Sequence, residues 1–393
     1  MQTSCSLRKL TVLIWVVNLC AICASTLSYI FLSYYIYKET SSLIYSQVVL
    51  FSPMILPIVF VGQIYRLSDR VSPRKILCLT NLLALWVAVC VYLLLPHFAF
   101  VAVVGGIAIG ALDALQRVGR IVAIKCYFNS VNIESTLALT LTAQFIAGGI
   151  AGAAMAMVKG DMMPWHALLI TAVLFSTAAF AAYLLPRVKR PVATSVPQLA
   201  ALVKTFTDLL KTNLQLRRSF WQFIIFVSIY QGFFNVSRII LPAHVMGLSE
   251  GYVGLLQAVN SVAALVGAVF YYTLSKRGYI LAPVYMAVVS AFFMIIAAHG
   301  GGLISSYGAY FLYIFFFELV FFKLQSDVVL STPVNAMPLI ASVQYAGVYA
   351  GMIVTIFLGS LLVEYVGLLW AGVVLFVCYL LLLSAFRTTG QAA

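Results

Sequence analysis

Charged residues are scarce in this sequence, and their scarcity excludes a soluble globular protein. They make up 8% of the 393 residues, whereas a soluble chain has about 25%. Hydrophobic residues account for 64%, and the mean hydropathy is +1.07. Long apolar runs of this kind are typical of membrane-spanning helices, so we predict an all-α membrane protein.

Motifs for catalysis are also missing. The sequence has no phosphate-binding glycine loop, no histidines at metal-ligand spacing and no nucleophile placed beside a base. Its seven cysteines form no close metal-type cluster. Most of them lie inside apolar runs, where cysteine acts as a small buried hydrophobic residue. We therefore expect no enzymatic activity, no cofactor and no bound metal.

Apolar runs divide the chain into two similar halves. A helix that crosses the bilayer takes about 20 residues, so a chain of this length with short loops holds about twelve. We predict twelve transmembrane helices in two pseudo-symmetric six-helix bundles, residues 1–185 and 220–393. The predicted spans are 10–37, 44–65, 76–95, 98–117, 135–158 and 166–185, then 220–245, 252–274, 280–298, 306–327, 339–363 and 368–386.

A basic linker, residues 186–219, joins the two halves. Within it, residues 199–214 place leucines and a phenylalanine at helical spacing, with Lys204 and Lys211 outside that stripe. This pattern predicts a short helix on the membrane surface with its basic residues towards anionic headgroups. A flexible charged tether is the alternative. The basic residues of the linker are Arg187, Lys189, Arg190, Lys204, Lys211, Arg217 and Arg218.

Lys and Arg residues set the orientation, because cytosolic loops carry an excess of them. The apolar run after Arg8 and Lys9 has no small-residue cleavage site, so we expect it to remain as the first span. Only Lys38 and Lys159 fall in the predicted outer loops. The cytosolic segments, with both termini inside, hold the basic residues of the linker together with Arg8, Lys9, Arg66, Arg70, Arg74, Lys75, Lys276, Arg277 and Arg387. Since the basic residues follow topology, the net charge of +13 predicts no nucleic-acid partner.

The loop after the second span carries a recognisable motif. It runs from Gly62 to Lys75 and contains Asp69-Arg70 and the basic residue Arg74. It resembles the loop signature of the major facilitator superfamily, a glycine followed by Asp-Arg and a basic pair. The glycine stands further from Asp69 than in the family pattern, and Ser-Pro replaces the usual second glycine. The resemblance implies a gating loop, in which the carboxylate pairs with arginines and a helix N-terminus and holds the two halves in one state. Plain topogenic charge explains the arginines but not Asp69.

The stretch 109–155 resembles one exporter branch of that superfamily, which includes enterobactin exporters and macrolide-efflux relatives. Arg117-Val-Gly-Arg120 matches the Arg-x-x-Arg of that branch in span four. A polar loop and a glycine-rich fifth span follow, with Gly148, Gly149 and Gly152. This resemblance implies transport out of the cell.

Polar and ionisable residues inside spans are costly, so they are candidates for function. The superfamily resemblance implies that spans one, four, seven and ten line a central cavity, with the substrate site between the halves near mid-bilayer. Spans one, four and seven each place such residues on one helical face, and span ten carries three charges. These residues are Asn18, Ser25 and Tyr29; Asp113, Arg117 and Arg120; Gln231, Asn235 and Arg238; and Glu318, Lys323 and Asp327.

Glu318 is the leading candidate for proton coupling, with Asp113 and Asp327 as further candidates. It lies near the middle of its span with no partner at i±3 or i±4. Apolar surroundings favour the neutral form of such a carboxyl, which lets it carry a proton; a structural role is the alternative. Lys323 and Asp327 could equally form a structural ion pair. Arg117 and Arg120 could snorkel to the cytosolic surface.

Once one or two carboxylates are protonated, the predicted cavity is net positive. Such a cavity suits an anionic or polyhydroxylated solute, with Tyr29, Tyr34, Tyr230 and Phe234 supplying apolar contact. We therefore predict a proton-coupled transporter of the bacterial inner membrane, with cytoplasmic termini and acting as a monomer among membrane lipids, that exports a siderophore-like metabolite or drug. An importer of an anionic solute or ferric siderophore is the alternative. A membrane-embedded enzyme or a sensor explains the intramembrane charges less well.

Overall fold

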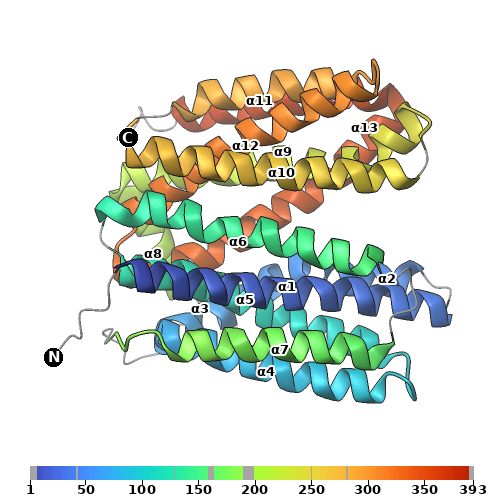
Figure 1. Cartoon of the computed structure of the whole chain (residues 1–393). Helices are drawn as coiled ribbons and strands as arrows, with labels where there is room; N and C mark the ends of the chain where they lie inside the picture. Colours follow the sequence, from blue (N-terminus) through green and yellow to red (C-terminus); the bar gives the residue numbers. More distant parts are fainter. Residues whose placement is uncertain are drawn as a thin grey trace. The chain divides into compact units, whose positions relative to one another are not determined.

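The computed structural model describes residues 7–40, 43–128, 130–157, 163–188, 199–248, 250–279 and 282–388. All regular secondary structure in these residues is helical (Figure 1). Three helices begin at proline, Pro73, Pro164 and Pro283, a residue whose fixed φ and missing N–H suit the first helical position. The helices of the first half are α1 Leu7–Thr40, α2 Leu43–Val59, α3 Val61–Arg70, α4 Pro73–Leu94, α5 Val101–Tyr127, α6 Ser130–Met157 and α7 Pro164–Tyr183.

The second half is helical in the same way. Helix α8, Leu199–Thr212, occupies part of the predicted linker; its position on a membrane surface stays a prediction, and Lys189 and Arg190 lie outside the described residues. The remaining elements are α9 Leu214–Ile240, the π turn η1 Leu241–Val245, α10 Glu250–Lys276, α11 Pro283–Ala298, α12 Leu303–Ser331, the 3-10 turn η2 Val334–Ala336 and α13 Met337–Thr388.

These helices account for the twelve predicted spans. Among the described residues, seven helices are long and apolar enough to cross a membrane, and the bent pair α2–α3 makes an eighth. Helix α13 is two helices joined at Gly367, whose φ of 82° suits glycine because it has no Cβ to clash. The second part of α13 and the helices α6, α9 and α11 coincide with the other four predicted spans.

The second span departs from the predicted straight helix and loop. Helices α2 and α3 meet at an angle of 76°, and α2 contains Pro53 and Pro57, which remove backbone hydrogen bonds and bend a helix. The predicted loop from Gly62 onward is instead helical as far as Arg70. Only residues 71–72 separate α3 from α4.

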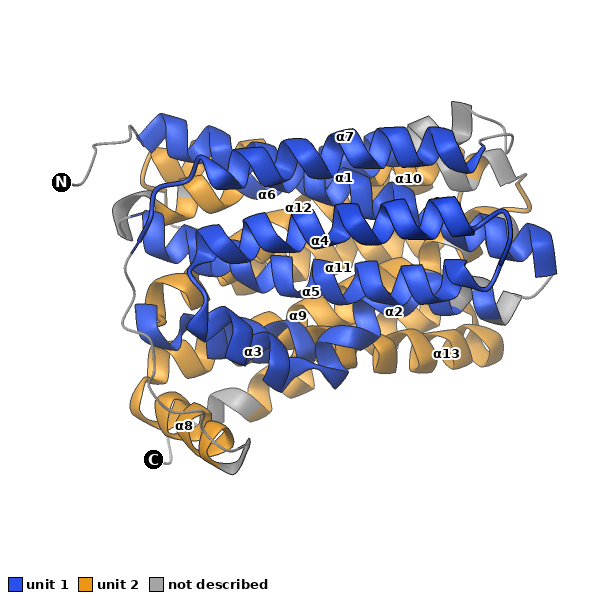
Figure 2. Ribbon diagram, turned by 90° about the horizontal axis from the view of Figure 1, so that it is seen from below, with its two compact units in different colours: residues 1–129, 140–199, 333–346 blue, residues 130–139, 200–332, 347–393 orange. Residues whose placement is uncertain are grey.

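The helices group into two compact units (Figure 2). Unit 1 comprises Met1–Asn129, Thr140–Leu199 and Pro333–Ala346, and unit 2 comprises Ser130–Leu139, Ala200–Thr332 and Gly347–Ala393. Helices α6 and α13 therefore each contribute to both units. The division of the sequence at residues 186–219 into two symmetric halves stays a prediction.

In unit 1, α1 packs on α5 and α7, and α4 lies beside α5 and α7. Its core contains Phe31 of α1, whose ring centroid lies 5.5 Å from that of Tyr92 on α4. The Tyr92 hydroxyl donates a hydrogen bond to Ser28 Oγ at 3.3 Å. The apolar body of tyrosine is thus buried while its polar end is satisfied.

In unit 2, α12 packs against α9, α10 and α11, and aromatic side chains fill the space between them. The ring centroid of Phe226 lies 4.5 Å from that of Tyr230 and 5.2 Å from that of Phe317. The Tyr230 hydroxyl donates to the Ala287 carbonyl at 2.8 Å, and the Tyr313 hydroxyl donates to the Tyr230 carbonyl at 2.6 Å. Tyr230 therefore belongs to the core of this unit.

Candidate functional site

The predicted site residues lie on four helices, two in each unit. Tyr29 lies on α1, and Asp113 and Arg117 lie on α5, all in unit 1. The residues of unit 2 lie on α9 and α12: Gln231, Asn235 and Arg238, then Glu318, Lys323 and Asp327.

An ion pair on α5 is the centre of the polar residues in unit 1. Arg117 Nε lies 2.8 Å from Asp113 Oδ2, an i,i+4 pair. The Asp113 side chain is 1% exposed and that of Arg117 is 26% exposed. Asp113 Oδ1 is buried and has no hydrogen-bond partner among the described residues. The arginine therefore supplies the charge that compensates a buried carboxylate.

Arg120 lies inside α5 and not at its end. The predicted span stopped at Arg117, whereas the helix continues to Tyr127. Arg120 is 4% exposed and its neighbour on the same helix, Gln116, is 2% exposed. This burial contradicts the alternative that Arg120 snorkels to the surface.

The polar stripe on α1 is buried in unit 1 over its whole length. Asn18, Ser25 and Tyr29 are 1%, 3% and 6% exposed. Asn18 Nδ2 donates to the Thr140 carbonyl at 3.4 Å, so this stripe connects α1 to α6. The spacing of these residues correctly placed them on one face of the helix.

The polar residues of α9 are half-buried. Asn235 Nδ2 donates to the Gln231 carbonyl at 2.8 Å. The Arg238 guanidinium lies 5.8 Å from the centroid of the Phe234 ring, within the range of a cation–π contact. Among the described residues, no carboxylate lies within ion-pair distance of Arg238. Arg238 lies in the last turn of α9, and its role in binding an anion stays a prediction.

Glu318 is buried in unit 2. It is 5% exposed, and its Oε2 has no hydrogen-bond partner among the described residues. Its side chain packs against α10 at Gly267, where an added Cβ would lie 2.9 Å from Glu318 Cβ. An ionised carboxylate in such surroundings would lack compensation, because it has neither a cation nor a full set of donors.

The other two charges of α12 belong to a network over three helices. Lys323 Nζ lies 2.7 Å from Asp327 Oδ1 and 3.5 Å from Glu134 Oε1 of α6. Ser275 of α10 donates to Glu134 Oε2 at 3.1 Å. These contacts support a structural role for Lys323 and Asp327, since they hold the start of α6 against α10 and α12 within unit 2.

Sequence reasoning missed Glu134 because the predicted span begins one residue later, at 135. A signal was present, since the chain has only ten acidic residues. Acidic residues at the edge of an apolar run, such as Glu134 beside the predicted span 135–158, are therefore candidates as well as those inside a span.

The residues of the predicted gating loop lie on two helices. Gly62, Asp69 and Arg70 are in α3, and Arg74 is in the first turn of α4. The Arg74 guanidinium lies 4.7 Å from the centroid of the Tyr183 ring. Asp69 is half-buried and Arg70 is exposed. The role of these residues in gating stays a prediction.

The close contact at Gly267 gives a test of the packing around Glu318. Gly267→Ala is expected to displace Glu318 or α10, because the new methyl would also lie 3.1 Å from the Phe315 carbonyl oxygen. We expect a loss of about 1–3 kcal/mol in stability, measured by denaturation of the purified protein. Gly308→Ala on α12 is the control, since no atom lies within 4 Å of its added Cβ. Equal stability of the two variants would contradict this packing.

A comparison with protein families decides the classification. The model described as Major Facilitator Superfamily matches residues 14–343. The chain belongs to this superfamily. It is accordingly a multi-pass membrane transporter, and the predicted superfamily and twelve-span architecture are confirmed. No curated protein sequence matches the chain.

Solved structures of superfamily transporters have the same fold. The human organic anion transporter MFSD10 (TETRAN) has a TM-score of 0.77 at 14% identity, covering 96% of this chain and 99% of its own. A bacterial homologue of the iron transporter ferroportin, in an outward-facing state, has a TM-score of 0.74 at 12% identity. The match covers 98% of this chain and 100% of the homologue. The fucose:proton symporter FucP of E. coli has a TM-score of 0.71 at 14% identity, covering 96% and 98%.

Proposed function

We propose that this superfamily member is a proton-coupled secondary transporter that exports a small anionic or polyhydroxylated metabolite, siderophore-like, or a drug, by alternating access. Burial of Glu318 is the observation that carries this proposal. A carboxyl that is 5% exposed and lacks a cationic partner among the described residues favours its neutral form. It then gains and loses a proton as access to water changes.

Proton coupling is assigned to Glu318 in preference to Asp113 and Asp327. Both of the latter are engaged by a cation at hydrogen-bonding distance, Arg117 and Lys323 respectively. A cation that stays in place stabilises the charged carboxylate and opposes its protonation. The known proton symport of FucP is consistent with coupling on this fold.

The arginines favour an anionic substrate. Arg238 has no carboxylate in ion-pair distance among the described residues, and Arg117 is 26% exposed, so both can meet a carboxylate or a phenolate. Guanidinium groups bind such oxygens in a bidentate manner. The organic anion transporter named above supports this class of solute.

The proposed direction of transport and the proposed location of the protein in the cell are inferred from the sequence. The resemblance of residues 109–155 to enterobactin and macrolide exporters favours export, and the distribution of Lys and Arg favours cytoplasmic termini in a bacterial inner membrane. We propose a monomer. Import of an anionic solute or a ferric siderophore by the same residues is the second candidate.

The direction is tested by comparing metabolites between a deletion strain and its parent under iron starvation. Export predicts a compound that is retained in the mutant cells and missing from the medium. A compound left behind in the medium of the mutant would instead establish import and overturn the proposed direction. Re-expression of the gene should restore the parental distribution in either case.

A further inference from the structure

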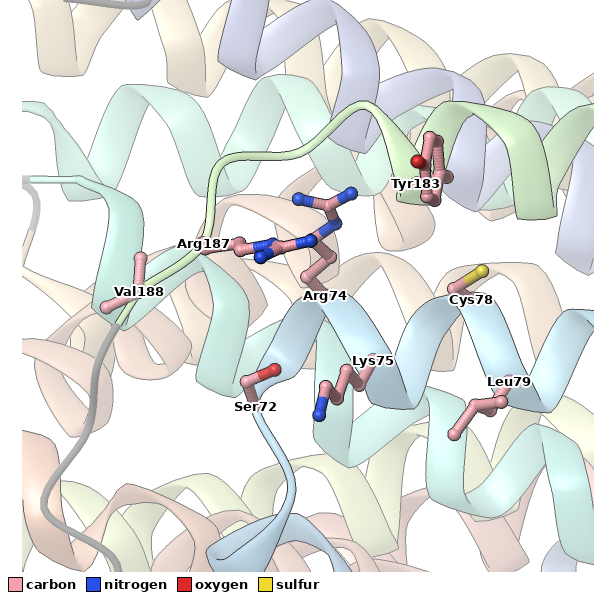
Figure 3. A pocket seen from close by; sticks show the side chains of 8 residues that line it. All are labelled: Ser72, Arg74, Lys75, Cys78, Leu79, Tyr183, Arg187 and Val188. Atoms are coloured by element: carbon pink, nitrogen blue, oxygen red, sulfur yellow. The ribbon is translucent and has the colours of Figure 1, made fainter. Parts of the chain in front are cut away.

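A cavity of about 630 Å³ opens at the end of α4 and α7 in unit 1 (Figure 3). Three cations line it, Arg74 and Lys75 from the first turn of α4 and Arg187 from the segment after α7. No carboxylate is among the described residues that line it. The described residues include no ion pair to any of the three cations. The described part of the lining therefore carries three positive charges and no negative one.

The side chains are arranged around one space. Figure 3 shows the Arg187 side chain extended towards Arg74, although two guanidinium groups repel each other. Arg74 is also positioned by Tyr183, whose ring centroid lies 4.7 Å from the guanidinium carbon. An anion between these cations would relieve the repulsion and accept hydrogen bonds from both.

The backbone adds to the positive potential. Helix α4 has 22 residues and begins at Pro73, and its N-cap Ser72 makes no side-chain capping hydrogen bond. The N–H groups of the first helical turn have no partner within the helix, and the helix dipole favours an anion there. This contribution supports the same ligand as the three side chains.

The rest of the lining is apolar and continues along the membrane-spanning surface. Leu79 of α4 and Tyr183 of α7 line the cavity and are 51% and 57% exposed. Beyond them, Leu82 on α4 and Phe180 on α7 are 46% and 64% exposed. Both helices are long and apolar enough to span a membrane, so we expect these exposed side chains to face lipid tails. A ligand that follows this surface has an anionic head and an apolar tail.

We propose that this cavity binds a phosphate group, and that its source is the headgroup of an anionic phospholipid such as phosphatidylglycerol. The phosphate lies between Arg74, Lys75 and Arg187, and the acyl chains lie along Leu79 and Phe180. Basic pockets between transmembrane helices near the cytosolic boundary suit such headgroups. This inference is independent of the transported solute and of its direction.

The site is tested with the purified full-length protein by native mass spectrometry during titration with phosphatidylglycerol. The double variant Lys75→Gln/Arg187→Gln is expected to bind the lipid roughly 25-fold more weakly, about fivefold for each cation removed. The matched control is Lys276→Gln/Arg277→Gln, which removes two exposed cations at the end of α10 and should change the affinity less than about twofold. Equal weakening of both variants would overturn the site, because it would reflect net charge alone.

The source of the phosphate is tested by repeating the titration with phosphatidylcholine, with inorganic phosphate and with glycerol 1-phosphate. If phosphatidylglycerol binds selectively and the variant Lys75→Gln/Arg187→Gln loses this binding, the phosphate comes from the lipid headgroup. Binding of inorganic phosphate with equal affinity, lost in the same variant, would overturn the lipid source and assign the cavity to a soluble phosphate. If the double variant does not fold, Arg187→Gln alone is used, because this exposed side chain lies beyond the end of α7.

Discussion

Glu318→Gln is expected to abolish concentrative transport while leaving exchange of the solute across the membrane intact. Glutamine keeps the shape of the side chain and remains neutral, so it reproduces the protonated state but cannot release the proton. The carrier can then still change conformation with solute bound. It can no longer make that change depend on a proton gradient.

The size of this effect follows from the energy of the gradient. With the membrane potential clamped, a pH difference of about one unit is worth about 1.4 kcal/mol for each proton moved. That energy supports roughly tenfold accumulation of solute with one proton per cycle. Reconstituted wild-type protein should reach this ratio, whereas the variant should equilibrate the solute at equal concentrations.

Glu364→Gln provides the matched control, because Glu364 is an exposed carboxylate of the same unit. It should accumulate solute as the wild-type protein does. Unchanged accumulation by Glu318→Gln would remove Glu318 from the mechanism. Loss of exchange as well as accumulation would mean that the substitution damages the fold or the binding of solute.

Arg117→Ala is expected to produce the largest loss of stability among the substitutions considered. It leaves Asp113, whose side chain is 1% exposed, as a buried carboxylate without its cation. Removing one partner of a buried pair costs about 3–5 kcal/mol, and partial exposure of Arg117 places the expected loss near about 3 kcal/mol. Reversible denaturation of the purified protein measures it.

The double variant Asp113→Asn/Arg117→Gln separates the charge from the packing. It removes both charges and keeps the approximate volume, so most of the lost stability should return. Stability of Arg117→Ala within about 0.5 kcal/mol of wild type would contradict a compensating ion pair. A double variant as unstable as the single one would show that packing of the arginine stem is what matters.

The number of spans could be predicted from the sequence because each requires a long apolar run. The bend between α2 and α3 was not predicted. The run 44–65 is mostly apolar and uncharged, whereas the direction of its axis depends on Pro53 and Pro57, whose effect on a helix depends on its neighbours. Apolar character alone does not distinguish a straight span from a broken one.

The end of α5 was placed too early for an electrostatic reason. The predicted span 98–117 ended at Arg117 and left out Arg120 and Lys125, two further charges that would be costly in lipid. Inside unit 1, however, Asp113 lies 2.8 Å from Arg117 and Arg120 is 4% exposed. Burial among other helices, which sequence alone does not give, allows α5 to continue to Tyr127.

The candidate site was predictable in part. Helical spacing grouped the polar residues of α1, α5 and α9, because residues three or four apart share a face. Helical spacing could not predict contacts between different helices. Glu134 of α6 contacts Lys323 of α12, although the two residues are far apart in the sequence. Gly267 of α10 lies close to Glu318 of α12. Such pairs depend on packing and not on local spacing.

Proton coupling through Glu318 is tested by measuring the proton movement that the solute drives. Vesicles containing the full-length protein and a pH-sensitive dye, with the potential clamped, receive the compound that the metabolite comparison supplies. Addition of solute should change the pH in vesicles with the wild-type protein and should not change it in vesicles with Glu318→Gln. Solute movement without any pH change in the wild-type protein would contradict proton coupling.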